Sequence, residues 1–519
     1  MKIGVYDKWL SSFGGGEKVA TVMAECLSNA GYKVDLISNF DVEKEELEKK
    51  MGVNLPKVRM VFWPERSYQK LDSETKKYDL FINVSFFDHL PSKAKKSIYY
   101  IHFPTPIKRS LWGLVKYETI LPFLRKYLII PEIVKGLRYI DEVVIRGGKW
   151  LSNENIFVFS NSPKRFSLKI RVYAEKLIIS SLDALSFTSP NASVEIKDKY
   201  IDHNNNVLTY KLAVRLKKKE NFILHIVNSE SSFDNSMGLV SLTVNDFRYL
   251  LWNFIKRYLP TYEMALYGSS LYKPAAGLDT YDLFLANSRF TIKWTEEYWG
   301  KSADLLYPPV DVQEFKLGKK ENIILNVGRF FTGGHSKRQD ILVEVFKRLI
   351  DSGRLDKSWE LHLVGGVASA EEYRNFFLSI RNQADKYPIF FHTQMGFQEL
   401  KKLYSRAKIY WHATGYGGNE NKSPITFEHF GITVVEAMAA GCVPVVFRGG
   451  GLTETVDSND LTWRSKERLE TITLDLINNP EVMKKHSLYA IHRAQRYSRE
   501  NFEKQFLGIV GNIIGNKNG

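Results

Sequence analysis

The stretch 423-SPITFEHFGITVVEAMAAGCVPVV-446 organises our interpretation of the whole chain. Its first residues are typical of a loop, and the composition then changes to helix-forming residues that end at a glycine. Val443 to Phe447 form a short apolar run that predicts a buried parallel strand. Two carboxylates, Glu428 and Glu436, lie on either side of the expected helix start, with seven residues between them. The stretch therefore predicts a loop, a helix and a strand of an α/β domain.

The expected helix start suits a phosphate-containing ligand. A loop that enters a helix leaves backbone N–H groups unpaired at the positive end of the helix dipole, and such a terminus binds phosphate readily. Glu428, before the helix, and Glu436, inside it, can then reach opposite ends of an elongated ligand whose diphosphate lies between them. A nucleotide-sugar has this shape, because its diphosphate separates a hydroxyl-rich sugar from a ribose.

This combination resembles the E-x7-E signature of the retaining glycosyltransferases of family 4. The wording EHFGITVVEAMAAGCVPVV is especially similar to the eukaryotic α-1,2-mannosyltransferases of that family, which extend lipid-linked oligosaccharides. An ordinary helix–strand unit is the alternative, since E-x7-E alone occurs by chance. The flanking EAMAAG and the later Gly449–Gly451 favour the family. The resemblance implies an α/β protein with the GT-B fold, in which two Rossmann-like domains face a cleft.

Composition limits the classes of partner. The chain has 519 residues, enough for about three domains. Hydrophobic residues make up 44% and charged residues 25%, as in folded globular proteins. The formal net charge of +15 fits nucleic acid, an anionic membrane or acidic substrates. No zinc-finger spacing, homeodomain-like pattern or RNA-binding aromatic signature accompanies it, so we do not expect a nucleic-acid partner.

Cysteine usage and hydropathy predict where the protein works. The sequence contains Cys26 and Cys442 alone, which argues against a disulfide framework and fits a reducing compartment. The first residues, MKIGVYDKWL, are typical of a strand rather than a signal peptide, and no apolar run approaches 18 residues. We therefore expect a cytoplasmic protein. Peripheral contact with the inner face of the cell membrane stays open.

The N-terminal part predicts a Rossmann-like domain. An expected strand, Lys2 to Tyr6, is followed by a loop with Gly14, Gly15 and Gly16, then a helix and a second strand, Lys33 to Ser38. Glycines at the first turn of such a unit let the backbone approach a ligand closely, although a tight turn alone would also need them. The spacing is not that of a dinucleotide fingerprint. The resemblance implies that these glycines face the donor diphosphate and the acceptor.

A histidine ends another expected strand, Lys96 to His102, in the segment YIHFPTP. Open α/β sheets bind ligands at the carboxyl ends of their strands. A lone histidine is often simply packed or hydrogen-bonded, and this alternative stays open. The segment resembles the family's YIH-P element, which implies that His102 approaches the transferred sugar.

Bulky apolar residues are interleaved with cations between Leu111 and Ile140, where Pro122 and Pro131 divide the segment into expected short helices. A basic amphipathic stretch of this kind can lie on an anionic bilayer. It can equally face the core and expose its lysines to solvent. In the GT-B fold this part of the first domain lines the acceptor side, which favours contact with a membrane or a lipid-linked acceptor.

The pattern changes between about residues 150 and 245, where apolar and polar residues alternate. Phe166, Leu168, Ile170 and Val172 follow this period of two, and turn-forming runs separate the alternating segments. Such patterning predicts antiparallel strands. We therefore predict a β-sandwich-like module inserted in the N-terminal half. The family resemblance does not extend to it, so glycan binding, oligomerisation and spacing all stay open as its role.

The α/β pattern then resumes and gives the expected domain boundaries. Residues 1–149 and 246–315 form the acceptor-side domain, and residues 150–245 form the inserted module. The segments LFLANSRFT and YPPVD resemble the family's last strand of this domain and its linker. Residues 316–497 form the nucleotide-sugar-binding domain. Residues 498–519 resemble the family's C-terminal helix, which crosses back to the first domain.

Cations follow the first expected strand of the second domain, Ile323 to Asn326. Arg329 comes at once, and Lys337 and Arg338 come after a glycine-containing loop. Arginine can bind phosphate through two hydrogen bonds, and lysine acts as a point charge. The family has an arginine and a lysine here that neutralise the leaving diphosphate. The loop is longer than in the family, so we choose Lys337 and keep Arg338 as the alternative. Surface cations without a role are the other possibility.

The resemblance implies one set of site residues. The catalytic set is Glu428, His102, Arg329 and Lys337. The donor-binding set is Gly14, Gly15, Gly16, Phe430, Gly431, Ile432, Thr433, Glu436, Gly365 and Phe397. Neither glutamate is expected to act as a covalent nucleophile. No cofactor or metal is expected, because the scheme requires none and the chain lacks the D-x-D tripeptide that bridges a metal to the donor in the other major transferase fold.

We therefore expect a retaining glycosyltransferase that moves a sugar from a nucleotide diphosphate to a glycan acceptor. The sequence EHFGI favours GDP-mannose as the donor of a mannose. The alternative donors are UDP-linked glucose, N-acetylglucosamine or galactose. A lipid-linked oligosaccharide is the first choice of acceptor. A non-catalytic glycan-binding protein is the alternative from another class, and the intact glutamates and cations disfavour it. A phosphorylase-like enzyme would need a lysine for pyridoxal phosphate, which we do not identify.

Overall fold

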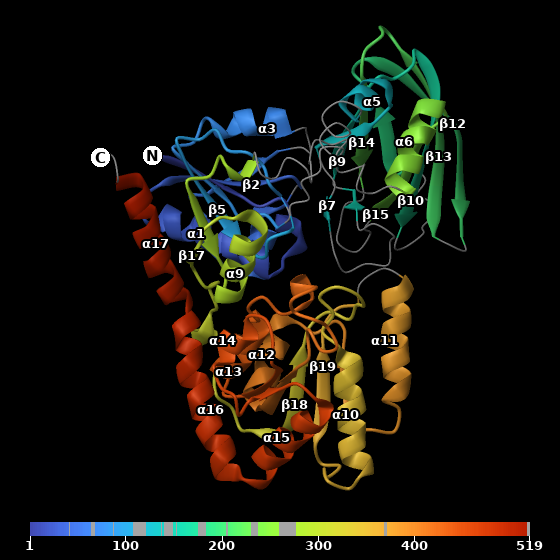
Figure 1. The fold of residues 1–519 in the computed structure, drawn as a ribbon. Coiled ribbons are helices and arrows are strands. Elements are labelled where there is room, and N and C mark those ends of the chain that lie inside the picture. Colours follow the sequence, from blue (N-terminus) through green and yellow to red (C-terminus); the bar gives the residue numbers. More distant parts are fainter. Residues whose placement is uncertain are drawn as a thin grey trace. The chain divides into compact units, whose positions relative to one another are not determined.

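The computed structural model describes residues 1–40, 42–63, 68–86, 88–106, 121–135, 138–139, 149–151, 153–174, 183–203, 206–229, 237–258, 277–367 and 371–515. The chain divides into two compact units. The first comprises residues 1–99 and 105–283, and the second comprises residues 100–104 and 284–519. The elements of both units are labelled in Figure 1.

A seven-stranded sheet with the order β17-β16-β5-β4-β1-β2-β3 forms around the N-terminal strand. Its strands are β1 (Lys2–Tyr6), β2 (Lys33–Ser38), β3 (Arg59–Phe62), β4 (Leu80–Asn83), β5 (Lys96–Ile101), β16 (Leu283–Ala286) and β17 (Asp304–Leu305). β1 pairs in parallel with β2 and β4, and β4 pairs in parallel with β5. The helix α1 (Gly15–Asn29) follows β1 after a short loop. The parallel α/β arrangement predicted for this part of the chain is confirmed.

Two antiparallel sheets are inserted between β5 and β16, as the alternating sequence predicted (Figure 1). One has the order β12-β13-β10-β15-β8-β7 and the other the order β11-β14-β9-β6. Their strands are β6 (Pro131–Lys135), β7 (Arg138–Tyr139), β8 (Lys149–Trp150), β9 (Glu154–Phe159), β10 (Arg165–Ala174), β11 (Leu185–Thr188), β12 (Ala192–Asp202), β13 (Val207–Leu216), β14 (Phe222–Asn228) and β15 (Met237–Val244).

Segments before and after the alternating stretch help to close the core of this inserted module. Leu128 and Ile130, which precede β6, are buried in the same apolar cluster as Phe159 and Phe222. Trp252 of α6 (Phe247–Tyr258) belongs to this cluster as well. The module's core therefore draws on chain from both sides of the stretch whose sequence alternates.

The predicted basic amphipathic segment between residues 111 and 140 is described only in part. A helix, α5 (Leu121–Tyr127), forms as expected. Residues 131–135 were expected to be helical, but they form β6, which pairs with β9 in antiparallel fashion. This prediction is wrong because the hydrogen-bonding partner is distant in sequence, where local propensity gives no signal. The cations on which the membrane prediction rests lie mostly outside the described side chains.

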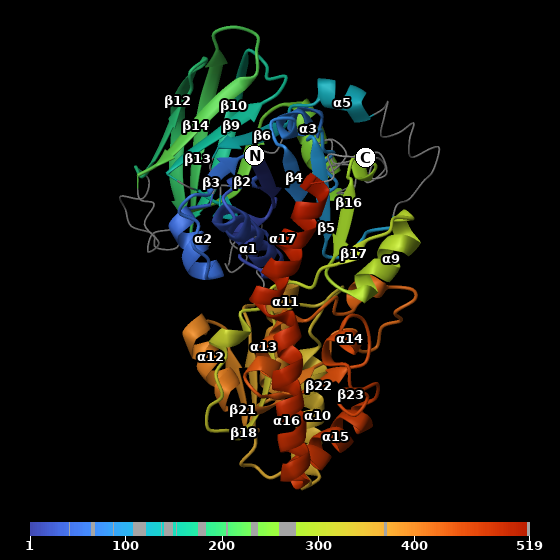
Figure 2. The same ribbon diagram turned by 90° about the vertical axis from the view of Figure 1, so that its left-hand side faces the viewer.

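The second unit contains a six-stranded sheet with the order β20-β19-β18-β21-β22-β23, and its pairs are parallel. The strands are β18 (Glu321–Val327), β19 (Glu360–Val364), β20 (Ile389–His392), β21 (Ala407–His412), β22 (Val443–Phe447) and β23 (Thr462–Trp463). The helices between and after them are α10 (Gln339–Asp351), α11 (Glu371–Gln383), α12 (Phe397–Arg406), α13 (Ile432–Ala439), α14 (Leu452–Val456), α15 (Lys466–Asn478) and α16 (Pro480–Ala494) (Figure 2). The loop, helix and strand predicted from residues 423–446 are confirmed.

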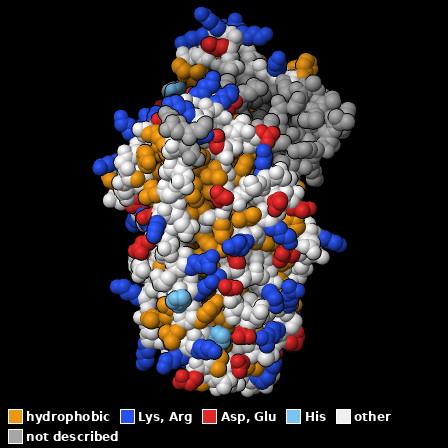
Figure 3. Space-filling model, turned by 60° about the vertical axis from the view of Figure 1, so that its left-hand side comes forward, with side chains coloured by type: hydrophobic (Ala, Val, Ile, Leu, Met, Phe, Trp, Pro, Cys, Tyr) orange, Lys and Arg blue, Asp and Glu red, His pale blue; other side chains and the backbone are white. Residues whose placement is uncertain are grey.

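The last described helix is α17 (Arg499–Gly515), which follows α16 after a short turn (Figure 2). None of the helices in the described ranges combines the length and the apolar character needed to cross a bilayer. On the face drawn in Figure 3, Lys and Arg side chains are scattered among acidic and uncharged ones. The excess positive charge is therefore not gathered into one patch on that face.

The inserted module should depend on Phe222, whose side chain is fully buried and whose ring centroid lies 5.4 Å from that of Phe159. Phe222→Ala removes this apolar contact and leaves a cavity, so the module should lose about 3–5 kcal/mol of stability. Hydrogen exchange of the β9 and β14 amides measures the loss. Val227→Ala on the same strand is the control, because that side chain is 39% exposed. Equal effects of the two substitutions would contradict the core placement of Phe222.

Candidate functional site

Glu428 is a buried carboxylate that side chains from two other loops hold in place. It lies between the 3-10 turn Pro424–Thr426 and α13, and it is 8% exposed. Its Oε2 accepts a hydrogen bond from Nζ of Lys337 at 2.5 Å and lies 3.1 Å from Nε2 of His412. Nε2 of His335 lies 3.7 Å from Oε1. His335 and Lys337 follow β18, and His412 ends β21, so the pairing of these two strands brings the group together.

The charges in this group are balanced by one ion pair. Burial opposes the ionisation of Glu428, but the cation of Lys337, with smaller contributions from His335 and from the hydrogen bond of His412, outweighs it, so the pKa of the carboxyl lies well below its usual range. Burial lowers the pKa of His335 to about 4. Burial also lowers the pKa of His412. Both imidazoles are therefore neutral at neutral pH, and Lys337 is the charge that keeps Glu428 ionised.

Three imidazole nitrogens near Glu428 are buried without a hydrogen-bond partner in the described part of the chain. They are Nε2 of His335, Nδ1 of His412 and Nε2 of His429. The ring of His429 stacks on that of Phe103 with centroids 4.2 Å apart, and it lies 4.9 Å from the ring of His335. Burial lowers the pKa of His429 well below its usual range, so this ring is neutral as well. A neutral imidazole can donate or accept a hydrogen bond, which suits a ligand that carries hydroxyl groups.

The start of α13 is open because no side chain caps it. Gly431 occupies the N-cap position with a φ of 91°, and a Cβ there would lie 2.7 Å from a methyl group of Leu452. Glycine is therefore required at this position. The N–H of Val434 donates to the carbonyl of Gly431 at 3.0 Å. The N–H groups of Ile432 and Thr433 lie in the first turn, where helix geometry supplies no acceptor, and they can receive an anion.

Glu436 lies inside the same helix, so the two glutamates flank its open first turn. It is half-buried, and its Oε2 accepts a hydrogen bond from the hydroxyl of Tyr404 at 2.9 Å. The ring of Phe430 is buried against Tyr307 and Tyr497, with centroids 5.7 and 5.2 Å away. The aromatic side chain at this position therefore packs inside the unit, and the role of Phe430 in donor binding stays a prediction.

The structure places Lys337, rather than Arg338, beside Glu428. Arg338 instead forms an ion pair with Asp340, in which Nη2 lies 2.9 Å from Oδ2. Its Nη1 donates to the carbonyl of Tyr416 at 2.6 Å. The two neighbouring cations thus serve different partners.

Three further predicted residues lie after neighbouring strands of the second sheet. Arg329 follows β18 and is exposed, with its guanidinium 6.0 Å from the ring of Phe331. Gly365 follows β19, and a Cβ there would lie 2.1 Å from the carbonyl oxygen of Gly328, so the two chain segments cross closely. Phe397 begins α12 and is 50% exposed. Their roles in binding the diphosphate and the base stay predictions.

The predicted site residues from the first half of the chain fall in different units. His102 belongs to the second unit with the rest of residues 100–104, and its carbonyl accepts a hydrogen bond from Asn287 at 2.9 Å. Gly14–Gly16 belong to the first unit. There the N–H of Gly14 donates to Oε2 of Glu17 at 2.6 Å. The contact of His102 with a sugar and that of the glycines with a diphosphate stay predictions.

Sequence reasoning did not identify His335, His412 and His429 as parts of the site. His429 adjoins Glu428 in the opening stretch, and His335 precedes Lys337 by two residues. His412 ends a strand next to the strand that leads to Lys337. A signal was available, because polar residues at the carboxyl ends of adjacent parallel strands meet at one edge of a sheet.

A family model covers the part of the chain that carries this site. Residues 310–493 match the family described as glycosyl transferases group 1. The matched range includes Arg329, Lys337, Glu428 and Glu436. The match covers the C-terminal part of the chain, about a third of its length. The resemblance inferred from the sequence is confirmed.

This chain is distantly similar to curated relatives named GDP-Man:Man(3)GlcNAc(2)-PP-Dol alpha-1,2-mannosyltransferase. The relative from Mus musculus is 30% identical over 184 residues, which cover 33% of this chain and 35% of the relative. The relative from Dictyostelium discoideum is 28% identical over 252 residues, which cover 45% of this chain and 47% of the relative. The chain thus spans about half the length, or less, of these curated relatives.

Solved structures share the fold over nearly the whole chain. HepE from Anabaena, in complex with UDP and glucose, has a TM-score of 0.51 at 12% identity, covering 99% of this chain and 100% of that one. Sucrose-phosphate synthase from Thermosynechococcus elongatus has a TM-score of 0.52 at 14% identity, covering 99% of both chains. With two parallel sheets and the inserted antiparallel sheets, the chain has the predicted GT-B fold.

The stability of the second unit should fall as the pH falls below about 6.5. His335 has a pKa of about 4, against an ordinary value of 6.5, and the pKa values of His412 and His429 are lowered too. Below about pH 6.5 the unfolded chain binds protons that the folded unit takes up only at lower pH, which for His335 is about pH 4. Stability therefore rises with pH through this window and is level above it.

Denaturant unfolding followed across this pH range measures the effect. His412→Gln should reduce the slope, because one of the contributing imidazoles is then missing. His203→Gln, which changes an exposed histidine of the inserted module, should leave the slope as it is. A wild-type profile that is level from about pH 4 to 7 would contradict the assignment of neutral histidines.

Proposed function

We propose that this chain is a retaining glycosyltransferase that moves a sugar, first of all mannose from GDP-mannose, to a glycan acceptor. The observation that carries this proposal is the ionised Glu428, paired with Lys337 and placed just before the open start of α13. An ionised carboxylate accepts hydrogen bonds from sugar hydroxyls, and the adjacent backbone N–H groups suit a diphosphate. The match of residues 310–493 to the group 1 family supports the same reaction.

In the proposed complex the donor lies along the first turn of α13. Glu428 accepts hydrogen bonds from hydroxyls of the transferred sugar, and Glu436 accepts them from the ribose. The N–H groups of Ile432 and Thr433 bind the diphosphate between them. The neutral rings of His335 and His429 add hydrogen-bonding groups without adding charge, so the diphosphate is drawn to the cations and the helix start rather than to the sugar end.

The proposed reaction breaks the bond between the anomeric carbon and the diphosphate oxygen. Negative charge then develops on the diphosphate, where Arg329, Lys337 and the amides of the helix start stabilise it. The acceptor hydroxyl forms the new bond from the face that the diphosphate leaves, and its proton passes to the departing phosphate oxygen. Retention of configuration follows because departure and attack share one face. Glu428 and Glu436 bind hydroxyls throughout and form no covalent bond.

Donor and acceptor are inferred from the relatives. The names of these relatives specify GDP-mannose as donor and Man(3)GlcNAc(2)-PP-Dol as acceptor. This similarity supports mannose transfer to a lipid-linked glycan by this chain. Such an acceptor would bring the protein to the inner face of a membrane. UDP-linked glucose, N-acetylglucosamine or galactose remain the alternative donors. HepE binds UDP and glucose, but at 12% identity it supports the fold alone.

A panel of nucleotide-sugars tests the function. One donor, expected to be GDP-mannose, should bind and be hydrolysed slowly without acceptor, which titration calorimetry and the released sugar measure. Glu428→Gln keeps the shape of the side chain and removes its charge, so hydrolysis and transfer should fall by roughly 10²–10³ while GDP still binds. Glu372→Gln, at an exposed position on α11, is the control.

Two results of this panel would overturn parts of the proposal. Turnover close to wild type in Glu428→Gln would remove its role in positioning the sugar. Glycan binding without hydrolysis or transfer from any donor would favour a non-catalytic glycan-binding protein.

Arg329→Ala should weaken the binding of a nucleoside diphosphate but not that of the nucleoside. A hydrogen bond to a charged group contributes about 1.5–3 kcal/mol, so the Kd of GDP should rise roughly ten- to a hundredfold. Titration of GDP and of guanosine measures the difference. Arg374→Ala, at an exposed arginine on α11, should affect neither ligand. Equal losses for GDP and guanosine would remove Arg329 from the diphosphate site.

A further inference from the structure

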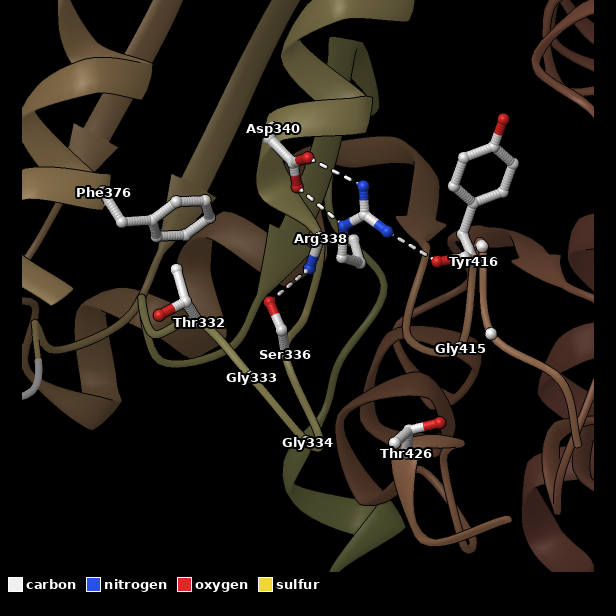
Figure 4. A pocket seen from close by; sticks show the side chains of 12 residues that line it. Thr332, Gly333, Gly334, Ser336, Arg338, Asp340, Phe376, Gly415, Tyr416 and Thr426 are labelled. Carbon is white, nitrogen blue, oxygen red and sulfur yellow. Dashed lines mark hydrogen bonds and ion pairs between the residues drawn. The ribbon is translucent and has the colours of Figure 1, made fainter. Parts of the chain in front are cut away.

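A cavity beside the Glu428 group takes no part in the proposed reaction. Its volume of about 420 Å³ lies within the range of small-molecule sites, roughly 300–1,000 Å³. It opens between the loop after β18 and the loop after β21, with one wall from α11 (Figure 4). The side chains that line it include Thr332, Ser336, Arg338, Phe376, Tyr416 and Thr426.

The cavity and the Glu428 group lie on two sides of the same backbone. The side chain of Lys337 reaches Glu428, whereas its neighbour Arg338 lines the cavity. On the other loop Gly415 lines the cavity, and a Cβ there would lie 2.6 Å from the ring of Phe427, the residue before Glu428. A ligand in the cavity would therefore be separated from the Glu428 group by one layer of the chain.

The wall of the cavity is fixed at Arg338. Its φ of 51° lies in the left-handed region, where a residue with a side chain persists only if its surroundings hold it. The guanidinium is held by Asp340, with Nε 3.1 Å from Oδ1 and Nη2 2.9 Å from Oδ2, and by the carbonyl of Tyr416 at 2.6 Å (Figure 4). These bonds tie the two loops together, so the cavity exists before a ligand arrives.

The charge of the cavity is balanced within it. Arg338 and Asp340 are the charged residues among the described ones that line it, and they are paired with each other. Three of the five N–H donors of Arg338 are engaged by Asp340 and by the carbonyl of Tyr416, and a phosphate or carboxylate ligand would meet a cation whose charge Asp340 already balances. The cavity therefore favours a ligand without charge.

The remaining lining residues combine an aromatic ring with hydroxyl groups and bare backbone. Phe376 of α11 lies next to Thr332 (Figure 4), and Thr426, whose hydroxyl donates to the carbonyl of Ser423 at 2.7 Å, lines the cavity from the turn Pro424–Thr426. Gly333 and Gly334 have open space where a Cβ would stand, so their backbone groups are accessible. A saccharide has an apolar C–H face that can cover an aromatic ring and a rim of hydroxyls that bond to hydroxyl and peptide groups. The aromatic ring, the hydroxyl group and the accessible backbone of the cavity match these two parts of a saccharide.

We propose that this cavity binds uncharged sugar units of the glycan acceptor that lie beyond the unit receiving the transferred sugar. The assignment to an acceptor rests on the proposed glycosyltransferase function, whereas saccharide binding itself does not. Phe376 provides the apolar contact, Thr332 provides a hydroxyl, Gly333 and Gly334 provide backbone groups, and the balanced charge of the Arg338–Asp340 pair disfavours anionic units. The cavity thus extends the recognition of the acceptor into the second unit.

Binding of neutral trisaccharides to the full chain tests this proposal. The probes are mannotriose, maltotriose and chitotriose, with inorganic phosphate as an anionic competitor, and saturation-transfer NMR and titration calorimetry measure their Kd. Phe376→Ala and Thr332→Val should each raise the Kd of a bound trisaccharide about tenfold. Leu378→Ala, on the same helix but outside the cavity and 48% exposed, should leave it unchanged. GDP should bind all three variants as it binds the wild type, and phosphate should not displace the trisaccharide.

Three outcomes would overturn the proposal: wild-type protein that binds none of the trisaccharides, equal affinity in Phe376→Ala and Leu378→Ala, or displacement of the trisaccharide by phosphate. Failure of the transferase function looks different. In that case no nucleotide-sugar is bound or hydrolysed, while trisaccharide binding still depends on Phe376. Both proposals are supported together if the protein hydrolyses a donor and also binds a trisaccharide. In that case Phe376→Ala should raise the KM for the acceptor and leave the KM for the donor unchanged.

Discussion

The ion pair between Lys337 and Glu428 is the constraint on which the rest of the second unit's site depends. A carboxylate as deeply buried as Glu428 stays ionised only with a partner, and removing one member of a buried pair costs about 3–5 kcal/mol. The 2.5 Å contact fixes the long loop after β18 against the segment that enters α13. That loop carries Arg329 at one end and Arg338 at the other, where Asp340 and the carbonyl of Tyr416 hold the guanidinium in addition.

The histidines around this pair are neutral, so hydrogen-bonding groups and positive charge come from different residues of the site. Burial keeps His335, His412 and His429 uncharged, so they offer hydrogen bonds and shape without attracting anions. Positive charge is left to Lys337 and Arg329, and to the partial charges at the start of α13. In the proposed complex, this division would orient a charged donor along its length, because its diphosphate and its sugar would meet different kinds of groups. These groups are in place before binding, so little reorganisation is needed when charge develops.

Much of the fold could be predicted from the sequence, because a continuous apolar run indicates a buried helix or strand and an alternating run indicates an antiparallel strand. α13, β22 and the inserted antiparallel strands follow such patterns. Prediction failed at β6, whose partner β9 lies beyond the reach of local pattern. It missed His412, whose closeness to Glu428 comes from the pairing of β18 with β21 rather than from spacing. Lys337 could be chosen from the sequence only with Arg338 kept as the alternative, because the position of Arg338 depends on a left-handed backbone conformation that directs it to Asp340.

The insertion between β5 and β16 has a consequence for the order in which the chain matures. These strands are neighbours in the first sheet, although about 180 residues separate Ile101 from Leu283. At about 5–20 residues per second, a ribosome needs roughly 10–40 s to make the missing partner. The open edge of β5 is a template for wrong pairing during that time. The inserted sheets and α6, complete by Tyr258, can fold within the same interval. Because synthesis runs from the N-terminus, the inserted module can fold first. The sheet whose strands β5 and β16 flank the module in sequence can be completed only afterwards.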